Sequence, residues 1–227
     1  MATLKYDRVF FDLDGTITDS APGILASVRY ALRKYDEQAA ASGACAVREP
    51  SDGELNFFIV PPLVDSFRKL LGCGPEAANR CLMWYREFYT GGGMLMNRVY
   101  PGVPEMLAEL RRDGARLVLA TAKPEVYARR ILEHFGLAES FDYIHGATLD
   151  EERNQKHQVI AWALENSGGP GRTVMVGDRE NDITGAKVNG LPSIGVLWGY
   201  GSEAELREAG ADIICGKAEE LFSLLTL

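Results

Sequence analysis

The chain has 227 residues, which is long enough for one globular core with a smaller inserted domain. Of its residues, 46% are apolar and 25% are charged, as is ordinary for a globular protein. Its formal net charge of −8 argues against a nucleic-acid-binding protein, because phosphate backbones are bound by an excess of Lys and Arg. No run approaches the ~20 apolar residues of a membrane span, and residues 1–5 lack the apolar stretch of a signal peptide, so we expect no membrane partner and a cytoplasmic location.

The first recognisable element is a short apolar strand with acidic residues directly behind it. Val9–Phe11 is rich in branched and aromatic side chains, which is typical of a buried strand in a parallel sheet. Asp12 and Asp14 follow, and two carboxylates this close are costly unless a cation such as Mg²⁺ offsets their charge. Gly15 lets the backbone turn closely, so we expect its amide and that of Thr16 to face an anion. Turn or cap residues are the alternative interpretation of the two acids.

The stretch from Ser20 to Arg98 has a helical pattern, and no strand is evident in it. Residues 36–52 are rich in Ala, Gly and Ser and allow no assignment. We expect helices from Pro22 to about Tyr35, from about Leu63 to Leu71, and from Pro75 to the glycines at 91–93. The expected apolar faces are Ile24, Leu25, Val28, Ala31 and Leu32 in the first helix, and Ala77, Cys81, Trp84 or Tyr85, and Phe88 in the third.

From Pro101 onward, helices and short strands alternate, which predicts a parallel sheet with helices on both faces. Ser202 and Glu205 indicate a capping box at the start of one helix. We expect strands over 117–120, 143–144, 174–176, 192–197 and 212–214, and helices over 102–112, 124–135, 154–166, 181–189, 203–209 and at the C-terminus, where Leu221, Leu224 and Leu225 form an apolar face. The expected fold is α/β, a doubly wound parallel-sheet Rossmann-like core with an inserted all-helical domain.

Polar residues follow three of the expected strands at their carboxyl ends, namely Asp12, Thr121 and Asp178. In doubly wound sheets the ligand binds beyond the carboxyl ends of the strands. One polar residue at a strand end is also typical of a helix cap. Three polar residues at strand ends whose chemistry suits one reaction indicate a shared site.

The cysteines and histidines give no sign of a metal site or a disulfide framework. No C-x-x-C pair is present, and the histidines lack metal-ligand spacing among themselves. We expect reduced thiols in packing positions for Cys45, Cys73, Cys81 and Cys215, and surface or structural roles for His134, His145 and His157.

The motifs resemble those of the haloacid dehalogenase superfamily of phosphohydrolases. Phe11–Thr16 matches the first motif of that family, Thr121 the second, Lys156 the third, and Gly177–Asp178 with Asp182 the acidic fourth. The first and fourth motifs are highly specific, whereas a Thr after a strand or a Lys at a helix start is common. The resemblance covers nearly the whole expected core.

Further segments resemble the phosphoglycolate-phosphatase-like branch of the family. They are Ala120–Pro124, Val176–Arg179 and Gly195–Gly201. Phe58–Leu63 resembles the branch too, but its members often carry Gly where Val60 stands. That departure bears on the identity of the substrate.

In this family, an insertion after the first strand is the cap that closes over the active site. The resemblance therefore implies a core domain of residues 1–18 and 99–227 and a helical cap domain of residues 19–98. Arg68 and Lys69 in the cap could meet a substrate carboxylate or a second phosphate, with a solvated helix face as the alternative.

The resemblance and the chemistry of phosphate esters together imply catalytic roles. A phosphomonoester dianion repels an incoming carboxylate, so attack needs cations and a fixed geometry. We expect Asp12 as the nucleophile that forms an aspartyl-phosphate, and Asp14 as the acid for the leaving alcohol and then the base for water. Thr121, the Ala122 amide and Lys156 would bind the transferring phosphoryl group.

The same resemblance implies a bound Mg²⁺. Asp14 would contribute its backbone carbonyl, and Asp182 would either bind through water or orient Lys156. The full expected set of metal ligands is Asp12, Asp14, Asp178 and Asp182, and the expected substrate-binding residues are Gly15, Thr16, Ala122 and Lys123.

The expected function is Mg-dependent hydrolysis of a small phosphorylated metabolite, of the phosphoglycolate or nucleoside monophosphate class, by a monomer or homodimer. Haloacid dehalogenases lack the second acid of the first motif, so Asp14 favours phosphate over carbon–halogen chemistry. A phosphomutase of the beta-phosphoglucomutase type keeps both acids and stays open. A non-catalytic phosphate-ligand sensor on the same fold is the other alternative, although no motif residue is missing.

Overall fold

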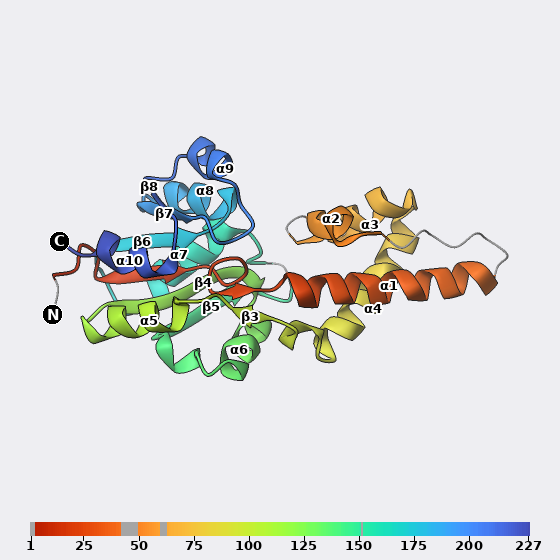
Figure 1. Cartoon of the computed structure of the whole chain (residues 1–227), viewed down its shortest axis with the longest axis horizontal. Helices are drawn as coiled ribbons and strands as arrows, with labels where there is room; N and C mark the ends of the chain where they lie inside the picture. The colour runs from red at the N-terminus through yellow and green to blue at the C-terminus, as the bar shows by residue number, and fades with distance from the viewer. Residues whose placement is uncertain (1–2, 42–49, 60–62, 151) are drawn as a thin grey trace. The chain divides into compact units, whose positions relative to one another are not determined.

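The chain forms two compact units, one of residues 1–19 and 98–227 and one of residues 20–97. The first unit carries the main sheet, and the second is helical (Figure 1). The computed structural model describes residues 3–41, 50–59, 63–150 and 152–227.

The larger unit is built around a six-stranded sheet with the order β5-β4-β1-β6-β7-β8. The first strand lies inside the sheet, in red between green β4 and cyan β6 in Figure 1. Neighbouring strands pair in parallel throughout, which confirms the predicted doubly wound parallel sheet. The strands are β1 (Arg8–Phe11), β4 (Arg116–Pro124), β5 (Tyr143–Ala147), β6 (Thr173–Gly177), β7 (Ser193–Val196) and β8 (Ile213–Cys215).

Helices connect the strands and cover the sheet. They are α5 (Val103–Arg112), α6 (Glu125–His134), α7 (Lys156–Asn166), α8 (Glu180–Val188), α9 (Glu203–Ala209) and α10 (Ala218–Leu225). Helices α7 and α8 pack against β4 and β6. The buried cluster between them consists of Phe10, Val118, Ala120, Val159, Ile160, Ala163, Met175 and Ala186. The central strands are thus held on an apolar face, which fixes the position of their carboxyl ends.

The start of α9 differs from the predicted capping box. The Ser202 side chain accepts a hydrogen bond from the Glu205 amide, as an N-cap should. The Glu205 carboxylate does not complete the box, because it accepts hydrogen bonds from Arg179 Nε at 2.7 Å and from the Glu180 amide at 3.0 Å. Glu205 therefore ties α9 to the start of α8.

A small second sheet flanks the helical insertion and was not predicted from the sequence. β2 (Thr18–Asp19) and β3 (Arg98–Val99) pair antiparallel, with Asp19 opposite Arg98. Each strand has only two residues, too few to give an alternating pattern. The pairing brings together the two points at which the chain leaves and re-enters the larger unit.

The helical unit contains α1 (Ala21–Ala41), α2 (Asp52–Leu55), α3 (Leu63–Leu71) and α4 (Pro75–Thr90). Helix α4 packs against both α1 and α3. Helix α1 is longer than the predicted end near Tyr35. Its extension carries Glu, Gln and Ala, which favour helices, and a Lys34–Glu37 ion pair at 3.5 Å supports it.

The buried face of α1 agrees with the prediction except for half-buried Leu25, whereas that of α4 is shifted. In α4, Ala77 and Phe88 are only half-buried. The buried residues are Ala78, Cys81, Tyr85 and Tyr89, and the two tyrosines stack at 5.4 Å between ring centroids. The buried stripe of α4 is thus rotated by about one residue from the face that the sequence suggested, because its position depends on the helices that pack against it.

Candidate active site

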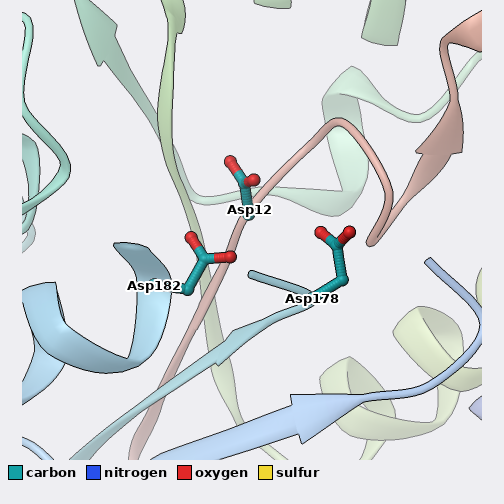
Figure 2. Close-up of side chains that lie close together, drawn as sticks. All are labelled: Asp12, Asp178 and Asp182. Carbon is teal, nitrogen blue, oxygen red and sulfur yellow. The ribbon is translucent and has the colours of Figure 1, made fainter. Parts of the chain in front are cut away.

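Neighbouring parallel strands bring the predicted acidic residues to one edge of the sheet. Asp12 directly follows β1, and Asp178 directly follows β6, which is paired with β1. Asp182 lies in the first turn of α8. Figure 2 shows the three side chains close together, with Asp12 and Asp178 on strand ends and Asp182 on a helix. The carboxyl ends of these strands therefore bring together three of the acids that the sequence predicted to share one site.

A tight turn follows Asp12, and its amides are used within the turn. The Gly15 amide donates to the Thr18 carbonyl at 2.7 Å, and the Thr16 amide donates to the Leu13 carbonyl at 3.3 Å. Both amides therefore have partners within the turn, and their contact with a substrate anion stays a prediction. The Thr16 hydroxyl instead donates to Asp178 Oδ1 at 3.1 Å, so Thr16 supports an acidic residue of the site.

Lys156 binds two of the acids at once. It is the first residue of α7, its side chain is 6% exposed, and its Nζ lies 2.6 Å from Asp12 Oδ1 and 2.7 Å from Asp182 Oδ1. The ammonium also donates to the Ala120 carbonyl at 3.2 Å. Burial lowers the pKa of Lys156, but the charges of Asp12 and Asp182 outweigh that effect and hold the pKa above its ordinary value. Lys156 is therefore a permanent cation beside Asp12.

Asp178 and Asp182 are almost completely inaccessible to solvent. Burial raises the pKa of both carboxyls, and the negative charges of the neighbouring acids raise it further, while Lys156 partly opposes the shift at Asp182. Asp178 accepts hydrogen bonds from neutral groups, the Thr16 hydroxyl and the Tyr200 amide. A buried carboxylate with neutral donors is in an environment where added positive charge would be strongly stabilising.

The acids form a group that could hold a metal ion. Within the part of the chain that the structure describes, oxygens of Asp12, Asp178 and Asp182 lie within 4.8 Å of one another. Hard oxygen ligands of this kind fit Mg²⁺. The Asp14 carboxylate is not part of the group, so any contribution of Asp14 to a metal would come from its backbone, as the sequence analysis expected.

Glycines allow the acidic side chains to approach the backbone. Gly15 has φ of +84°, and a Cβ there would overlap the Asp178 carboxylate. A Cβ at Gly177 would overlap Asp182, and one at Gly199 would overlap Asp178. These positions leave no room for any side chain, so the cluster depends on glycine at each.

The loop after β7 supports the site, a role that was not predicted from the sequence. The Trp198 indole donates to the Thr16 carbonyl at 2.9 Å, and the Tyr200 amide donates to Asp178 Oδ2 at 2.8 Å. The Tyr200 hydroxyl donates to Asp19 Oδ1 at 2.9 Å. The sequence signal for this loop is the set of closely spaced glycines Gly195, Gly199 and Gly201.

The second predicted motif lies on β4, next to Asp14. Strand β4 continues beyond Thr121 to Pro124, and its register against β5 shifts between these two residues. The buried Thr121 hydroxyl oxygen accepts a hydrogen bond from the Lys123 amide at 3.2 Å, while Ala122 is exposed. Lys123 Nζ lies 2.7 Å from Asp14 Oδ2. Lys123, expected at the substrate, thus contacts a predicted catalytic acid.

Arg68 and Lys69 lie on the exposed side of α3 in the helical unit. Arg68 lies 3.9 Å from Asp65, and Lys69 Nζ lies 5.2 Å from the centre of the Phe57 ring. Both contacts are with neighbours in the same unit. They agree with the solvated-face alternative and leave substrate binding by these residues a prediction.

The cysteines and the buried histidine have structural surroundings. Cys73, Cys81 and Cys215 are free thiols, and burial raises the pKa of Cys81 to about 12 and of Cys215 to about 11, which makes both unreactive. His145 Nε2 lies 3.1 Å from Ser167 Oγ in the interior. Cys45 and Val60 lie outside the described residues.

None of the described helices is long and apolar enough to cross a membrane.

Comparison with known proteins agrees with the motif resemblance. The family described as haloacid dehalogenase-like hydrolase matches residues 6–190. A 5'-nucleotidase of Pseudomonas aeruginosa is 39% identical over 207 residues, which cover 91% of this chain and 89% of that protein. Tyrosine-protein kinase PtkA of Mycobacterium tuberculosis is 42% identical over 194 residues, or 85% of this chain and 62% of PtkA. A phosphoglycolate phosphatase of Vibrio cholerae is 29% identical over 207 residues, or 91% of each chain.

A solved structure extends the similarity to nearly the whole chain. The crystal structure of a predicted phosphatase from Clostridium acetobutylicum has a TM-score of 0.83 and 42% sequence identity. The match covers 96% of this chain and 97% of that one, so it includes the helical insertion as well as the sheet.

Proposed function

The chain belongs to the haloacid dehalogenase-like hydrolases and is a phosphatase of phosphomonoesters, and we propose that it hydrolyses nucleoside 5'-monophosphates with the help of Mg²⁺. The observation that carries the chemistry is the buried cluster of Asp12, Asp178 and Asp182 with Lys156 between two of its members. The nucleotide class is supported by the 39% identity to a 5'-nucleotidase, against 29% to a phosphoglycolate phosphatase over an equal length.

In the proposed reaction, a carboxylate oxygen of Asp12 attacks phosphorus while the bond from phosphorus to the ester oxygen breaks. Asp14 donates a proton to that leaving oxygen. Asp14 then removes a proton from water, which attacks the aspartyl-phosphate, releases inorganic phosphate and restores Asp12. Asp14 thus donates one proton to the leaving oxygen and accepts one from water, so it is protonated again at the end of the cycle.

Other side chains position and neutralise the phosphoryl group. Lys156 would hold positive charge beside the attacking Asp12 oxygen. Because the Thr121 oxygen accepts from the Lys123 amide, the Thr121 hydroxyl proton is left to donate to a phosphate oxygen. A Mg²⁺ held by Asp12, Asp178 and Asp182, with the Asp14 carbonyl as a further ligand, would neutralise the dianion. In this proposal residues 20–97 serve as the cap domain.

The test is release of inorganic phosphate from a panel of nucleoside 5'-monophosphates, phosphoglycolate, sugar phosphates and pyrophosphate, with Mg²⁺ and with a chelator. We expect release from nucleoside 5'-monophosphates that the chelator abolishes. Release of phosphate from phosphoglycolate alone would contradict the proposed substrate class but would agree with the proposed reaction. No release from any ester, together with isomerisation of a sugar phosphate that a sugar bisphosphate stimulates, would favour the phosphomutase.

A further inference from the structure

Lys123 is a nearly buried cation that the reaction described above does not use. Its side chain is 8% exposed, and its Nζ lies 2.7 Å from Asp14 Oδ2, whose side chain is 23% exposed. An ammonium with this little access to water is costly to bury unless its partner is fixed in place. The ion pair with Asp14 is therefore part of the structure of the site, whereas exposed ion pairs on a protein surface are weak and easily exchanged.

The irregularity in β4 explains how the side chain reaches Asp14. Thr121 pairs with Gly146 and Pro124 pairs with Ala147, so two residues of β4, Ala122 and Lys123, stand between consecutive residues of β5. Extra residues of this kind redirect side chains and are frequent beside active sites. The bulge places the Lys123 side chain on Asp14 and its amide on the Thr121 hydroxyl oxygen.

The two lysines of the site contact different acids. Lys156 contacts Asp12 and Asp182, which belong to the carboxylate group that could hold a metal. Lys123 contacts Asp14, whose carboxylate lies outside that group. A carboxylate whose oxygens bind a metal ion is poorly suited to donate or accept a proton. The Lys123 contact thus favours a different task for Asp14.

The contact also leaves one Asp14 oxygen for chemistry. Lys123 holds Oδ2, while Oδ1 is buried and has no hydrogen-bond partner among the described residues. A buried polar oxygen without a partner is unfavourable and needs an explanation. A leaving-group oxygen or a water molecule that exchanges a proton with Oδ1 would supply the missing partner.

From these contacts we propose that Lys123 is the positioning residue for proton transfer by Asp14, an assignment that rests on the proposed function. Lys123 holds Oδ2 so that Oδ1 meets the leaving oxygen. The ammonium itself neither gains nor loses a proton. This role replaces the direct contact with substrate that the sequence analysis expected of Lys123.

The experiment compares kcat/KM for two esters, a nucleoside 5'-monophosphate and 4-nitrophenyl phosphate. The first has a leaving alkoxide that needs a proton, and the second has a phenolate that leaves without one. kcat/KM reports the steps up to formation of the aspartyl-phosphate, so the later attack of water does not enter. We expect Lys123→Met to lower kcat/KM by about 100-fold for the nucleotide and by less than about fivefold for the nitrophenyl ester.

Further variants separate positioning from other roles. Lys123→Arg keeps the charge and should recover most of the nucleotide activity. Lys187→Met, at an exposed position of α8, is the matched control and should leave both esters unaffected. Adding Lys123→Met to Asp14→Asn should cost no further activity, because both changes remove the same proton transfer.

The same data can overturn the proposal. Equal losses with the two esters would show a general structural or phosphate-binding role, and a higher KM for the nucleotide at unchanged kcat would show direct substrate binding. Losses that multiply in the double variant would show that Lys123 acts independently of Asp14. If the wild-type protein releases phosphate from neither ester, the proposed function itself fails, and the role of Lys123 fails with it.

Discussion

At the scale of single residues, Lys156 makes the acidic cluster possible. Asp12 and Asp182 would repel each other in a buried site, and the Lys156 ammonium lies within 2.7 Å of an oxygen of each. A buried ion pair contributes little net stability, but removal of one partner leaves charge without compensation. Lys156 therefore matters both for the stability of the metal-free protein and for the charge balance of the reaction.

We expect Lys156→Met to lower the free energy of unfolding of the metal-free protein by about 3 kcal/mol and to reduce turnover by at least about 100-fold. Urea unfolding in the presence of a chelator and phosphate release with Mg²⁺ would measure the two effects. Lys187→Met, which changes an exposed lysine of α8, serves as the control. Wild-type turnover in Lys156→Met would remove Lys156 from the proposed mechanism.

At the scale of elements, the site depends on loops that approach one another without side chains. The loop after β7 brings Gly199 against the Gly15 carbonyl and the Asp178 side chain. The Tyr200 amide then reaches Asp178. This close approach and the hydrogen bond hold the Asp178 carboxylate in place.

We expect Gly199→Ala to raise the Mg²⁺ concentration needed for half-maximal activity by at least about tenfold, because the new methyl group must push Asp178 away. Gly171→Ala is the matched control, since a Cβ there would make only ordinary contacts, the nearest at 3.4 Å. Titration of activity with Mg²⁺ measures the effect. An unchanged titration curve would show that the close packing at Gly199 has no influence on the cluster.

Strand β5 contributes a pH-dependent term to stability. Burial lowers the pKa of His145 below its ordinary value of 6.5, while Glu125 partly opposes the shift. The folded protein thus favours neutral imidazole, and the unfolded chain binds the proton more readily. Stability rises with pH where the unfolded state binds more protons, so this contribution is complete above pH 6.5 and is lost as the pH falls below it.

We therefore expect the free energy of unfolding to fall less between about pH 8 and about pH 5.5 in His145→Asn than in the wild-type protein. Urea unfolding at the two pH values gives the difference, and His134→Asn at the exposed end of α6 is the control. A steeper pH dependence in His145→Asn would contradict the direction of the pKa shift.

The elements show where sequence reasoning succeeds and where it stops. Strand β1 and the acids after it could be predicted, because an apolar run followed by Asp12 and Asp14 is a local pattern. The Lys123–Asp14 contact could not, because it depends on the bulge in β4 and joins residues far apart in the chain. The pairing of Asp19 with Arg98 could not be predicted either, because a strand of two residues is too short to show an alternating pattern of apolar and polar residues.

At the scale of the whole molecule, the sheet and its connections confirm the predicted α/β fold. Alternating strands and helices are a repeated signal, so errors of a few residues at their ends do not change the topology. The buried face of α4 was misjudged by one residue, because the partners of a helix cannot be read from its own sequence. The roles of the site residues, and that of the helical insertion as a cap, stay predictions.

Every residue given a role in the reaction lies in the unit of residues 1–19 and 98–227. Because Asp19 and Arg98 are paired, an Asn-Gly turn could replace residues 20–97. We expect the shortened protein to unfold cooperatively and to keep Mg²⁺-dependent hydrolysis of 4-nitrophenyl phosphate, while its preference for nucleotides is lost. An unaltered preference would contradict a role of the helical unit in selecting the substrate, and loss of all hydrolysis from a folded core would show that the unit supplies part of the chemistry.

The proposed mechanism requires Asp12 to become phosphorylated during turnover. The direct measurement is an acid quench during hydrolysis of 4-nitrophenyl phosphate, followed by mass spectrometry of the peptides from the wild-type protein, Asp12→Asn and Asp14→Asn. We expect a phosphoryl group on the peptide that contains Asp12 in the wild-type protein, more of it in Asp14→Asn, where water is not activated, and none in a folded but inactive Asp12→Asn. Turnover by Asp12→Asn, or a phosphoryl group on another residue, would contradict the proposed mechanism.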